Sequence, residues 1–310
     1  MAVAMALDIA LGWPDRLFRR IGHPVTWLGR VVSALDRRMN RARWSFRARK
    51  LAGLAALLMV LALVCLPALL VQRSLPGGLP GALLTGVLAW PLLATRSLHD
   101  HVAAVARPLM AGDIAGGRRA VSMIVGRNPD HLDGPAIARA ATESLAENTS
   151  DGIVAPLFWG VLFGLPGIAA YKAINTLDSM IGHRTPRHEA FGWASARLDD
   201  GVNLLPARLT GLLFALVSGR PAAALRCMWR DAGRHRSPNA GWPEAAMAGA
   251  LGIRLSGPRI YDDRVADEPW LNGEAPDPAP ADLRRALGLY RRAMGALLLG
   301  LAAAAAVWQG

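Results

Sequence analysis

The stretch that decides the fold is residues 51–71, LAGLAALLMVLALVCLPALLV, which contains no charged side chain. A helix needs about 20 mostly apolar residues to cross the hydrocarbon core of a bilayer. Pro67 lies in the last turns of this run, and a membrane helix tolerates proline because neighbouring groups satisfy the freed backbone carbonyl. The run therefore predicts a membrane-spanning helix.

Further apolar runs occur at 79–95, 153–171, 204–218 and 293–308. The run at 153–171 is interrupted by Pro156, Gly164, Pro166 and Gly167, so it either spans the bilayer or breaks and re-enters. We expect an all-α, polytopic membrane protein with about four or five membrane segments, organised as a single membrane-embedded domain over residues 1–310.

The composition supports a membrane protein. Hydrophobic residues make up 53% of the chain and charged residues 19%, and the mean hydropathy is +0.26. A soluble domain is about 25% charged. The apolar content argues against a disordered chain and against an ordinary cytosolic enzyme.

Charge predicts the orientation in the membrane. The net charge is +12, and 33 of the 35 basic residues are arginine. Residues 13–50 hold 11 basic and two acidic side chains, and residues 220–259 hold seven arginines. Basic loops stay in the cytoplasm, so we expect 13–50, 96–150 and 220–259 on the cytoplasmic side of a cell inner membrane. The apolar runs make nucleic acid an unsuitable partner and the lipid bilayer a suitable one.

Two segments outside the apolar runs have distinct patterns. Residues 96–150 predict amphipathic helices with one break at Gly112-Asp113 and another at Asn128-Pro129. Residues 262–282, DDRVADEPWLNGEAPDPAPAD, predict an acidic, proline-rich loop.

The centre of the chain, residues 140–257, holds the chemistry. In AATESLAENTSDGIVAPLF at 140–158, Glu143, Glu147 and Asp151 recur every four residues, with Asn148 beside them. On a helix these carboxylates form one acidic stripe that repels itself unless a cation lies between them. The alternative is a solvated helix face paired with arginine.

Three similar groups follow. Lys172, Asn175 and Asp178 share one helix face just after an apolar run, where charges are costly and are functional candidates, unless Lys172 only extends to the interface. Asp199, Asp200 and Asn203 lie between Arg197 and Arg208, and a surface charge cluster is the alternative. Asn239 and Glu244 lie in a Gly/Pro-rich stretch whose other interpretation is a capping loop.

Oxygen ligands of this kind suit Mg²⁺, which proteins bind through carboxylates and substrate phosphates. Lys172, Arg197 and Arg208 complement phosphate charge. Neither lysine lies in a G-x-x-x-x-G-K-[ST] loop, so a P-loop is absent. These residues predict a membrane-bound transferase or ligase that handles a phosphorylated substrate through Mg²⁺.

Several long motifs resemble one family. ESLAENTSDGIVAPLF, YKAINTLDSMIG, FGWASARLDDGVNLLPARLT and SPNAGWPEAAMAGALGIRLSG are similar to those of adenosylcobinamide-phosphate synthase, a membrane enzyme of cobalamin biosynthesis, and so is GHPVTWLGR at 22–30. The likeness covers about residues 5 to 300. The chain departs from the family at Gly12-Trp13-Pro14, where Gly-Asp-Pro is typical.

The resemblance implies ATP-dependent amide formation between adenosylcobyric acid, an adenosylcorrinoid, and aminopropanol or its phosphate. It implies substrate contacts with this corrinoid and amine, and it leaves contacts with other membrane enzymes of cobalamin assembly open. The site residues that it implies fall into three groups. The catalytic group is Glu143, Glu147, Lys172, Asp178 and Asp200. The group that binds substrate or phosphate is Asn148, Asn175, Arg197, Asn203, Arg208, Asn239 and Glu244. The group that binds Mg²⁺ is Glu147, Asp151, Asp199 and Asp200.

Two other classes of function remain open. A related family of membrane sensors shares the general architecture, but it does not need the acidic and lysine residues. A transporter with broken helices would suit Pro156, Pro166 and Gly167, but the sequence has no inverted repeat. For the shared site to form, the segment 153–170 must re-enter or break near 164–167.

Overall fold

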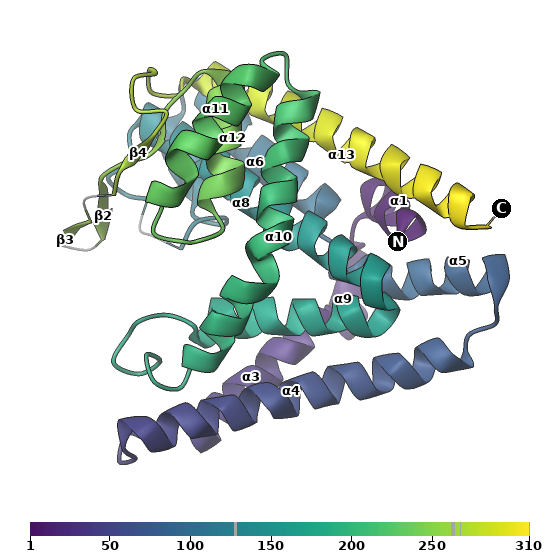
Figure 1. Cartoon of the computed structure of the whole chain (residues 1–310). Coiled ribbons are helices and arrows are strands. Elements are labelled where there is room, and N and C mark those ends of the chain that lie inside the picture. The colour runs from purple at the N-terminus through teal and green to yellow at the C-terminus, as the bar shows by residue number, and fades with distance from the viewer. Residues whose placement is uncertain (127–128, 262–263, 267, 310) are drawn as a thin grey trace. The chain divides into compact units, whose positions relative to one another are not determined.

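The computed structural model describes residues 1–126, 129–261, 264–266 and 268–309 (Figure 1). The all-α prediction is confirmed, because nearly all regular structure in this part of the chain is helical. Five of the described helices are long and apolar enough to cross a membrane, and each contains one of the predicted apolar runs to within a residue. They are Phe46–Ser74, Gly78–Met110, Gly134–Ile181, Trp193–Val217 and Pro280–Val307.

The chain packs as two compact units that alternate along the sequence. Unit 1 takes residues 1–94, 155–203 and the last few residues, and unit 2 takes residues 95–154 and 204–307. The single domain over 1–310 therefore remains a prediction.

Unit 1 is built around two long helices. Its elements are α1 (Ala2–Leu11), α2 (Asp15–Ile21), α3 (Pro24–Met39), α4 (Phe46–Ser74), α5 (Gly78–Ala89), the 3₁₀ turn η1 (Trp90–Leu92), α9 (Ala155–Ile181) and the first turns of α10 (Trp193–Val217). α4 runs along α9 and α3. Val60, Leu177 and Phe191 lie in the core between them. Gly53 permits this packing, since a Cβ there would lie 1.8 Å from the Phe191 carbonyl oxygen.

Helix α9 is broken at Gly164. This position lies in the stretch 164–167, where we expect a break if the segment does not span the bilayer as a straight helix. Gly164 has φ 67° and ψ −145°, a conformation almost restricted to glycine. After the break the chain folds back on itself. Gly167 then lies so close to Trp159 that a Cβ on Gly167 would be 2.2 Å from the Trp159 carbonyl oxygen. Gln72 at the end of α4 accepts a hydrogen bond from the Leu165 backbone N–H at 2.6 Å. This bond satisfies one of the backbone groups that the break exposes.

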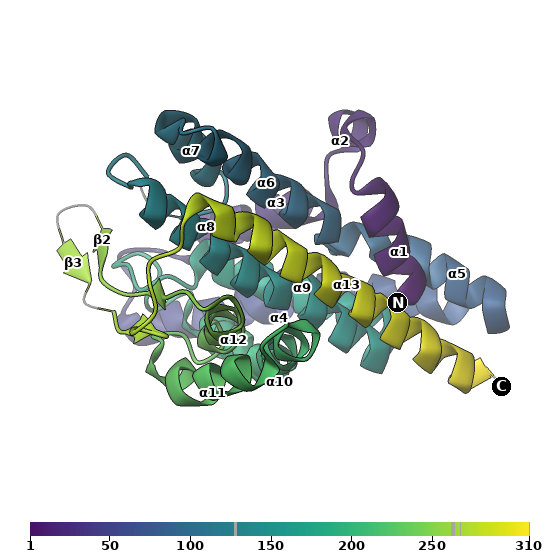
Figure 2. The ribbon, with the colours of Figure 1, turned by 90° about the horizontal axis from the view of Figure 1, so that it is seen from above.

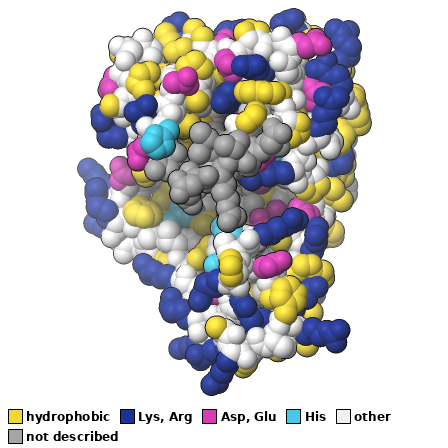
Figure 3. All heavy atoms as spheres, turned by 90° about the vertical axis from the view of Figure 1, so that its left-hand side faces the viewer, with side chains coloured by type: hydrophobic (Ala, Val, Ile, Leu, Met, Phe, Trp, Pro, Cys, Tyr) yellow, Lys and Arg dark blue, Asp and Glu magenta, His cyan; other side chains and the backbone are white. Residues whose placement is uncertain are grey.

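One end of unit 1 is strongly basic. Arg37, Arg38, Arg41, Arg43 and Arg47 are exposed where α3 ends and α4 begins, and basic side chains crowd the lower part of Figure 3. Behind them Asp36 receives two hydrogen bonds from Arg187, at 2.6 and 3.1 Å. This pair ties α3 to the segment between α9 and α10, so the two helices that carry the unit 1 site residues are held at one end.

Unit 2 packs helices around a buried α8. Its elements are α6 (Thr95–Met110), α7 (Ile114–Val121), α8 (Gly134–Thr149), the π-helical turn η2 (Ser150–Val154), the rest of α10, α11 (Pro221–Asp231), η3 (Ala232–Arg234), α12 (Gly241–Leu251) and α13 (Pro280–Gln309). α8 contacts α6 and α12, and α13 lies beside α6, where the Tyr290 hydroxyl donates to the Thr95 carbonyl at 2.6 Å (Figure 2).

The segment 96–150 contains helices as predicted, and Gly112 (φ 78°) breaks it at the first predicted place. Asn128 of the second predicted break lies outside the described residues. The expectation of amphipathic helices is wrong for α8. Residues 140–146 are buried on every side, because its alanines let neighbouring helices approach closely.

The prediction of an irregular loop at 262–282 is also wrong in part. Residues 262, 263 and 267 lie outside the described part, but β3 (Arg264–Ala266) pairs with β2 (Arg259–Tyr261), and β4 (Trp270–Leu271) pairs with β1 (Leu255–Ser256). Arg139 and Arg254 both bond the Asp277 carboxylate, at 2.9 Å and at 2.5 to 3.0 Å. These tertiary contacts order a segment whose composition alone indicates a loop.

Candidate functional site

The strongest cluster in unit 1 joins α9 to α10 through a buried carboxylate. Asp199 is 9% exposed, and its Oδ2 accepts a hydrogen bond from the Asn203 amide at 3.0 Å. Asn203 is itself held, because its Oδ1 accepts from the Tyr171 hydroxyl at 2.8 Å. The chain Tyr171–Asn203–Asp199 thus fixes the carboxylate with groups from both helices.

Asp199 has capacity for another partner. The amide of Asn175 lies beside its carboxylate, but among the described residues no hydrogen bond of standard geometry reaches Oδ1. A buried oxygen without a hydrogen bond is costly, and it marks a place where a cation or a substrate N–H would be favourable. The negative charges of Asp178 and Asp200 act on the same carboxylate. Five sequence-predicted residues therefore come together here: Asn175, Asp178, Asp199, Asp200 and Asn203.

Two basic residues border this cluster. Arg197 is exposed, and its Nη1 lies 3.4 Å from Asp200 Oδ2. Lys172 is half-buried on α9, and it is close enough to His23 for its charge to lower the pKa of the imidazole, together with burial, which is the larger cause. Burial and the like charge both disfavour the cationic form of His23.

The orientation of His23 follows from local structure. The ring caps α3, because its Nδ1 accepts a hydrogen bond from the Val25 backbone N–H at 3.2 Å. In the neutral ring Nε2 therefore carries the proton. Trp13 packs edge-on against the ring, with centroids 5.1 Å apart. Trp13 belongs to the Gly12-Trp13-Pro14 sequence that departs from the family pattern, and here it holds the histidine.

In unit 2 the acidic residues of α8 do not share one environment. Glu143 is buried, and its Oε1 accepts a hydrogen bond from the Ser256 backbone N–H at 2.7 Å. Ser256 has φ 60°, so the carboxylate holds a strained turn at β1. Glu147 and Asn148 are exposed.

Asp151 lies in the π-helical turn η2, which is wider than an α-helical turn. The α-helical spacing that predicts the stripe therefore does not extend to Asp151.

The remaining unit 2 candidates make separate contacts. Arg208 stacks on the Trp242 ring, 4.2 Å from Cζ to the centroid. Glu244 and Asn239 are buried, and the Oε2 of Glu244 lies 3.8 Å from His235 Nε2. Arg208 and Glu244 thus have local partners that the sequence did not reveal.

The fit to Mg²⁺ rests on the α9–α10 cluster. No three His, Cys, Asp or Glu side chains within the described ranges form a ready cage for a metal ion. Mg²⁺ does not need such a cage, because it keeps several waters and binds through one or two carboxylates plus substrate phosphates. Asp199, with an open buried oxygen, and the neighbouring Asp200 fit that requirement.

Two residues of the unit 1 cluster are not predicted as site residues by the sequence. Tyr171 occurs only as the first residue of YKAINTLDSMIG, and His23 occurs only in the motif GHPVTWLGR. The spacing of residues along one helix predicts neither contact. Tyr171 bonds Asn203 on another helix, α10, and His23 lies far from Lys172 in sequence. The sequence signal for His23 is its place in GHPVTWLGR, a stretch whose residues are more distinctive than those of an ordinary linker.

Comparison with known proteins indicates one family. Residues 1–290 match the family described as CobD/Cbib protein. A protein of Rhodobacter capsulatus named Cobalamin biosynthesis protein CobD is 65% identical over 310 residues, covering 99% of this chain and 97% of the relative. Proteins of the same name from Brucella suis and Rhizobium meliloti are 48% and 47% identical, covering 99% and 98% of this chain and 96% of each relative. No solved structure matches the chain.

Proposed function

Because the chain belongs to the CobD/Cbib family of cobalamin-biosynthesis proteins, we propose that it forms an amide bond between adenosylcobyric acid and aminopropanol or aminopropanol phosphate, at the expense of ATP. The observation that carries the proposal is Asp199, a buried carboxylate with an open oxygen that two helices hold in place. An oxygen of this kind can accept a hydrogen bond from an amine or coordinate a phosphate-bound cation.

The chemistry requires two steps, because a carboxylate is a poor acyl donor. In the first, the substrate carboxylate attacks the γ-phosphorus of ATP, and ADP leaves, which gives an acyl phosphate. In the second, the amine attacks the acyl carbon, phosphate leaves, and the amine gives up a proton. Mg²⁺, when bound, offsets charge on the transferring phosphoryl group.

The side chains of unit 1 have distinct parts in this scheme. The Lys172 ammonium binds phosphoryl oxygens as a compact point charge. His23, neutral and with its Nε2 proton available, donates a hydrogen bond to the same group. Asp178 binds the ammonium form of the amine and takes up the proton that it loses. Asp199 and Asp200 would hold the metal, and Asn175 and Asn203 keep Asp199 oriented.

In unit 2 we assign Glu143 to positioning, since its carboxylate already holds the backbone at Ser256. Glu147 and Asn148 are exposed. They remain predicted ligand-binding residues, with Glu147 and Asp151 as further candidates for the metal.

The test is direct conversion by the full chain in lipid nanodiscs. The protein is supplied with adenosylcobyric acid, ATP, Mg²⁺ and either aminopropanol or its phosphate, and the product is identified by mass spectrometry as the amide. We expect Asp199→Asn to lose activity about a hundredfold, as for a misplaced catalytic group. Asp100→Asn is the matched control, because the Asp100 side chain is 56% exposed and pairs with Arg96 and His99 on its own helix. Absence of amide with both amines would overturn the proposal.

A transporter is the second candidate, because the break of α9 at Gly164 is typical of helices that line a transport path. Proteoliposomes with external corrinoid separate the two. Uptake without ATP-dependent amide formation would favour the transporter.

We also propose that the protein lies in the inner membrane with residues 13–50, 96–150 and 220–259 in the cytoplasm. The exposed arginines at the junction of α3 and α4 support this orientation. ATP is cytoplasmic, so the same orientation would give the enzyme access to its co-substrate.

A further inference from the structure

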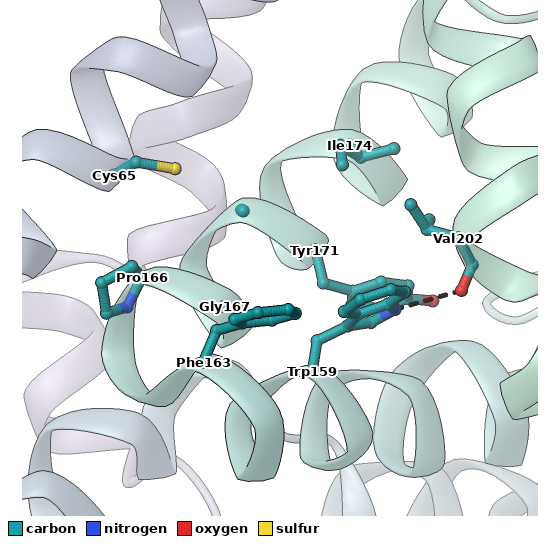
Figure 4. Close-up of a pocket in the computed structure, with 9 residues that line it drawn as sticks. Cys65, Trp159, Phe163, Pro166, Gly167, Tyr171, Ile174 and Val202 are labelled. Carbon is teal, nitrogen blue, oxygen red and sulfur yellow. Dashed lines mark hydrogen bonds between the residues drawn. The ribbon is translucent and has the colours of Figure 1, made fainter.

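Unit 1 contains a cavity of about 390 Å³ between α4, α9 and α10 (Figure 4). Its walls include Trp159, Phe163, Gly167 and Tyr171 of α9, with Cys65 of α4 and Val202 of α10. Figure 4 shows the Cys65 side chain directed from α4 toward the α9 residues. Within the described part of the chain, no charged side chain lines the cavity.

The break of α9 creates the cavity. Because the chain folds back after Gly164, the Trp159 and Phe163 rings form one wall, stacked with centroids 5.8 Å apart and planes 12° apart. Gly167 lies against the Trp159 carbonyl, where a Cβ would lie 2.2 Å from the oxygen, so the glycine lets the folded-back segment pack closely beside that wall. The cavity is therefore a built feature of the helix bend.

The polar groups on its lining are already occupied. The Trp159 Nε1–H donates to the Val202 carbonyl at 3.0 Å, and the Tyr171 hydroxyl donates to Asn203 at 2.8 Å. What these residues present to the cavity is apolar ring surface. Water has no partners there, so the cavity favours an apolar occupant.

Depth in the bilayer identifies the occupant. Cys65 precedes Arg73, the charged residue near the end of α4, by eight residues, or about 12 Å of helix. Half of the hydrocarbon core is about 15 Å thick, so Cys65 lies close to the middle of the membrane when Arg73 is at the interface. Lipid headgroups do not reach this depth, whereas acyl chains do.

The mouth of the cavity faces lipid. Phe163 is 58% exposed, and Leu66, the neighbour of Cys65, is 59% exposed. On a membrane helix such side chains contact acyl chains. An empty cavity would forfeit dispersion contacts on all of its walls, and a neighbouring acyl chain restores them.

We propose that this cavity is a binding site for one acyl chain of a membrane phospholipid. The chain enters past Phe163 and lies against the Trp159 and Phe163 rings, with its end toward Ala170 and Ile174. Tyr171 lines the cavity with its ring and holds Asn203 with its hydroxyl. A bound chain therefore packs the residue that supports the Asp199 cluster.

Photolabelling in nanodiscs tests the site. The full chain is placed in phosphatidylcholine nanodiscs that contain a phosphatidylcholine with a diazirine near the end of one acyl chain, and labelled residues are mapped by mass spectrometry. We expect label on Cys65 and on residues 159–174 well above that on Leu58, Leu63 and Leu70, which are exposed on α4 outside the cavity. A probe with the diazirine in its headgroup should leave the cavity unlabelled.

Two variants fill the cavity from different helices. Ala170→Phe and Val202→Phe should reduce the label in the cavity to the level of the exposed α4 leucines. Val161→Phe is the matched control, since Val161 is 57% exposed on α9 and does not line the cavity. It should leave the label unchanged.

Equal labelling of the cavity and of the exposed leucines, or stronger labelling by the headgroup probe, would overturn the proposal. Label that persists in the cavity of the Ala170→Phe and Val202→Phe proteins, when both fold, would also overturn it. If a filled variant fails to accumulate in the membrane, the wild-type ratio of cavity label to leucine label decides alone.

Discussion

Lys172 is one of two lysines in a chain where arginine supplies the other 33 basic residues. It shares a face of α9 with Asn175 and Asp178, and its charge acts on His23. Lys is a point charge on a flexible stem, whereas Arg is a wide planar fork. If Lys172 binds a phosphoryl oxygen in confined space, we predict that Lys172→Arg lowers the rate of amide formation about a hundredfold.

The other lysine provides the control. The Lys50 ammonium lies 3.4 Å from the centroid of the Trp193 ring, and a guanidinium stacks on an indole equally well. Lys50→Arg should therefore keep nearly full activity. Equal activity of both variants would show that position 172 needs only a positive charge.

His23 predicts a dependence of stability on pH. Burial and the charge of Lys172 lower its pKa in the folded protein, so the unfolded chain binds the proton more readily. The histidine therefore contributes its full stability above about pH 6.5, the ordinary value, and this contribution is lost as pH falls through the folded pKa. Protonation of Nδ1 would also remove the cap of α3, which is typically worth about 1 kcal/mol.

His23→Asn isolates this effect, because asparagine is a good N-cap that does not titrate. Thermal unfolding in nanodiscs from pH 5 to 8 should show a smaller loss of stability at low pH for the variant than for the wild type. Parallel curves would assign the acid sensitivity to other histidines.

At the scale of the element, the break of α9 depends on Gly164. A Cβ there would lie 2.0 Å from Gln72 Oε1, and its backbone conformation costs other residues on the order of 1 to 3 kcal/mol. We predict that Gly164→Ala lowers the unfolding temperature and the amount of protein in the membrane. The matched substitution is Gly295→Ala on α13, which has no atom within 4 Å and should stabilise that helix slightly. An unchanged unfolding temperature for Gly164→Ala would mean that α9 reforms as a straight helix without cost.

At the scale of the whole molecule, the arginine distribution predicts topology. Single cysteines at Arg43, Arg119 and Arg226 should react with a membrane-impermeant maleimide only when the cytoplasmic side is accessible. All three positions are exposed. Arg118 and Arg230 are unsuitable, because Arg118 donates to the Leu132 carbonyl at 2.8 Å and Arg230 bonds the buried Asp231 at 2.7 Å. Labelling of all three positions from the periplasmic side would contradict the orientation.

The native cysteines permit this experiment. Cys65 can be replaced by alanine. Cys227 can remain, because burial, and then the adjacent Asp231 charge, raise the pKa of its thiol to about 12. A thiol that stays protonated does not react at neutral pH.

The apolar runs alone determined that the protein is all-α and rich in membrane segments, because hydrophobicity and length are properties of the local sequence. Helical spacing likewise placed Lys172, Asn175 and Asp178 on one face, and the Pro/Gly pattern located the break that the structure has at Gly164. Spacing failed where the backbone left the α-helical form. The π turn η2 interrupts the α-helical spacing at Asp151, and a single-helix pattern cannot show that Glu143 turns to Ser256. Only tertiary structure joined Tyr171 to Asn203 and Asp199, brought Lys172 to His23 and opened the cavity beside Trp159. These features depend on contacts between segments far apart in sequence, and the helix packing that makes those contacts is not encoded in any one local pattern.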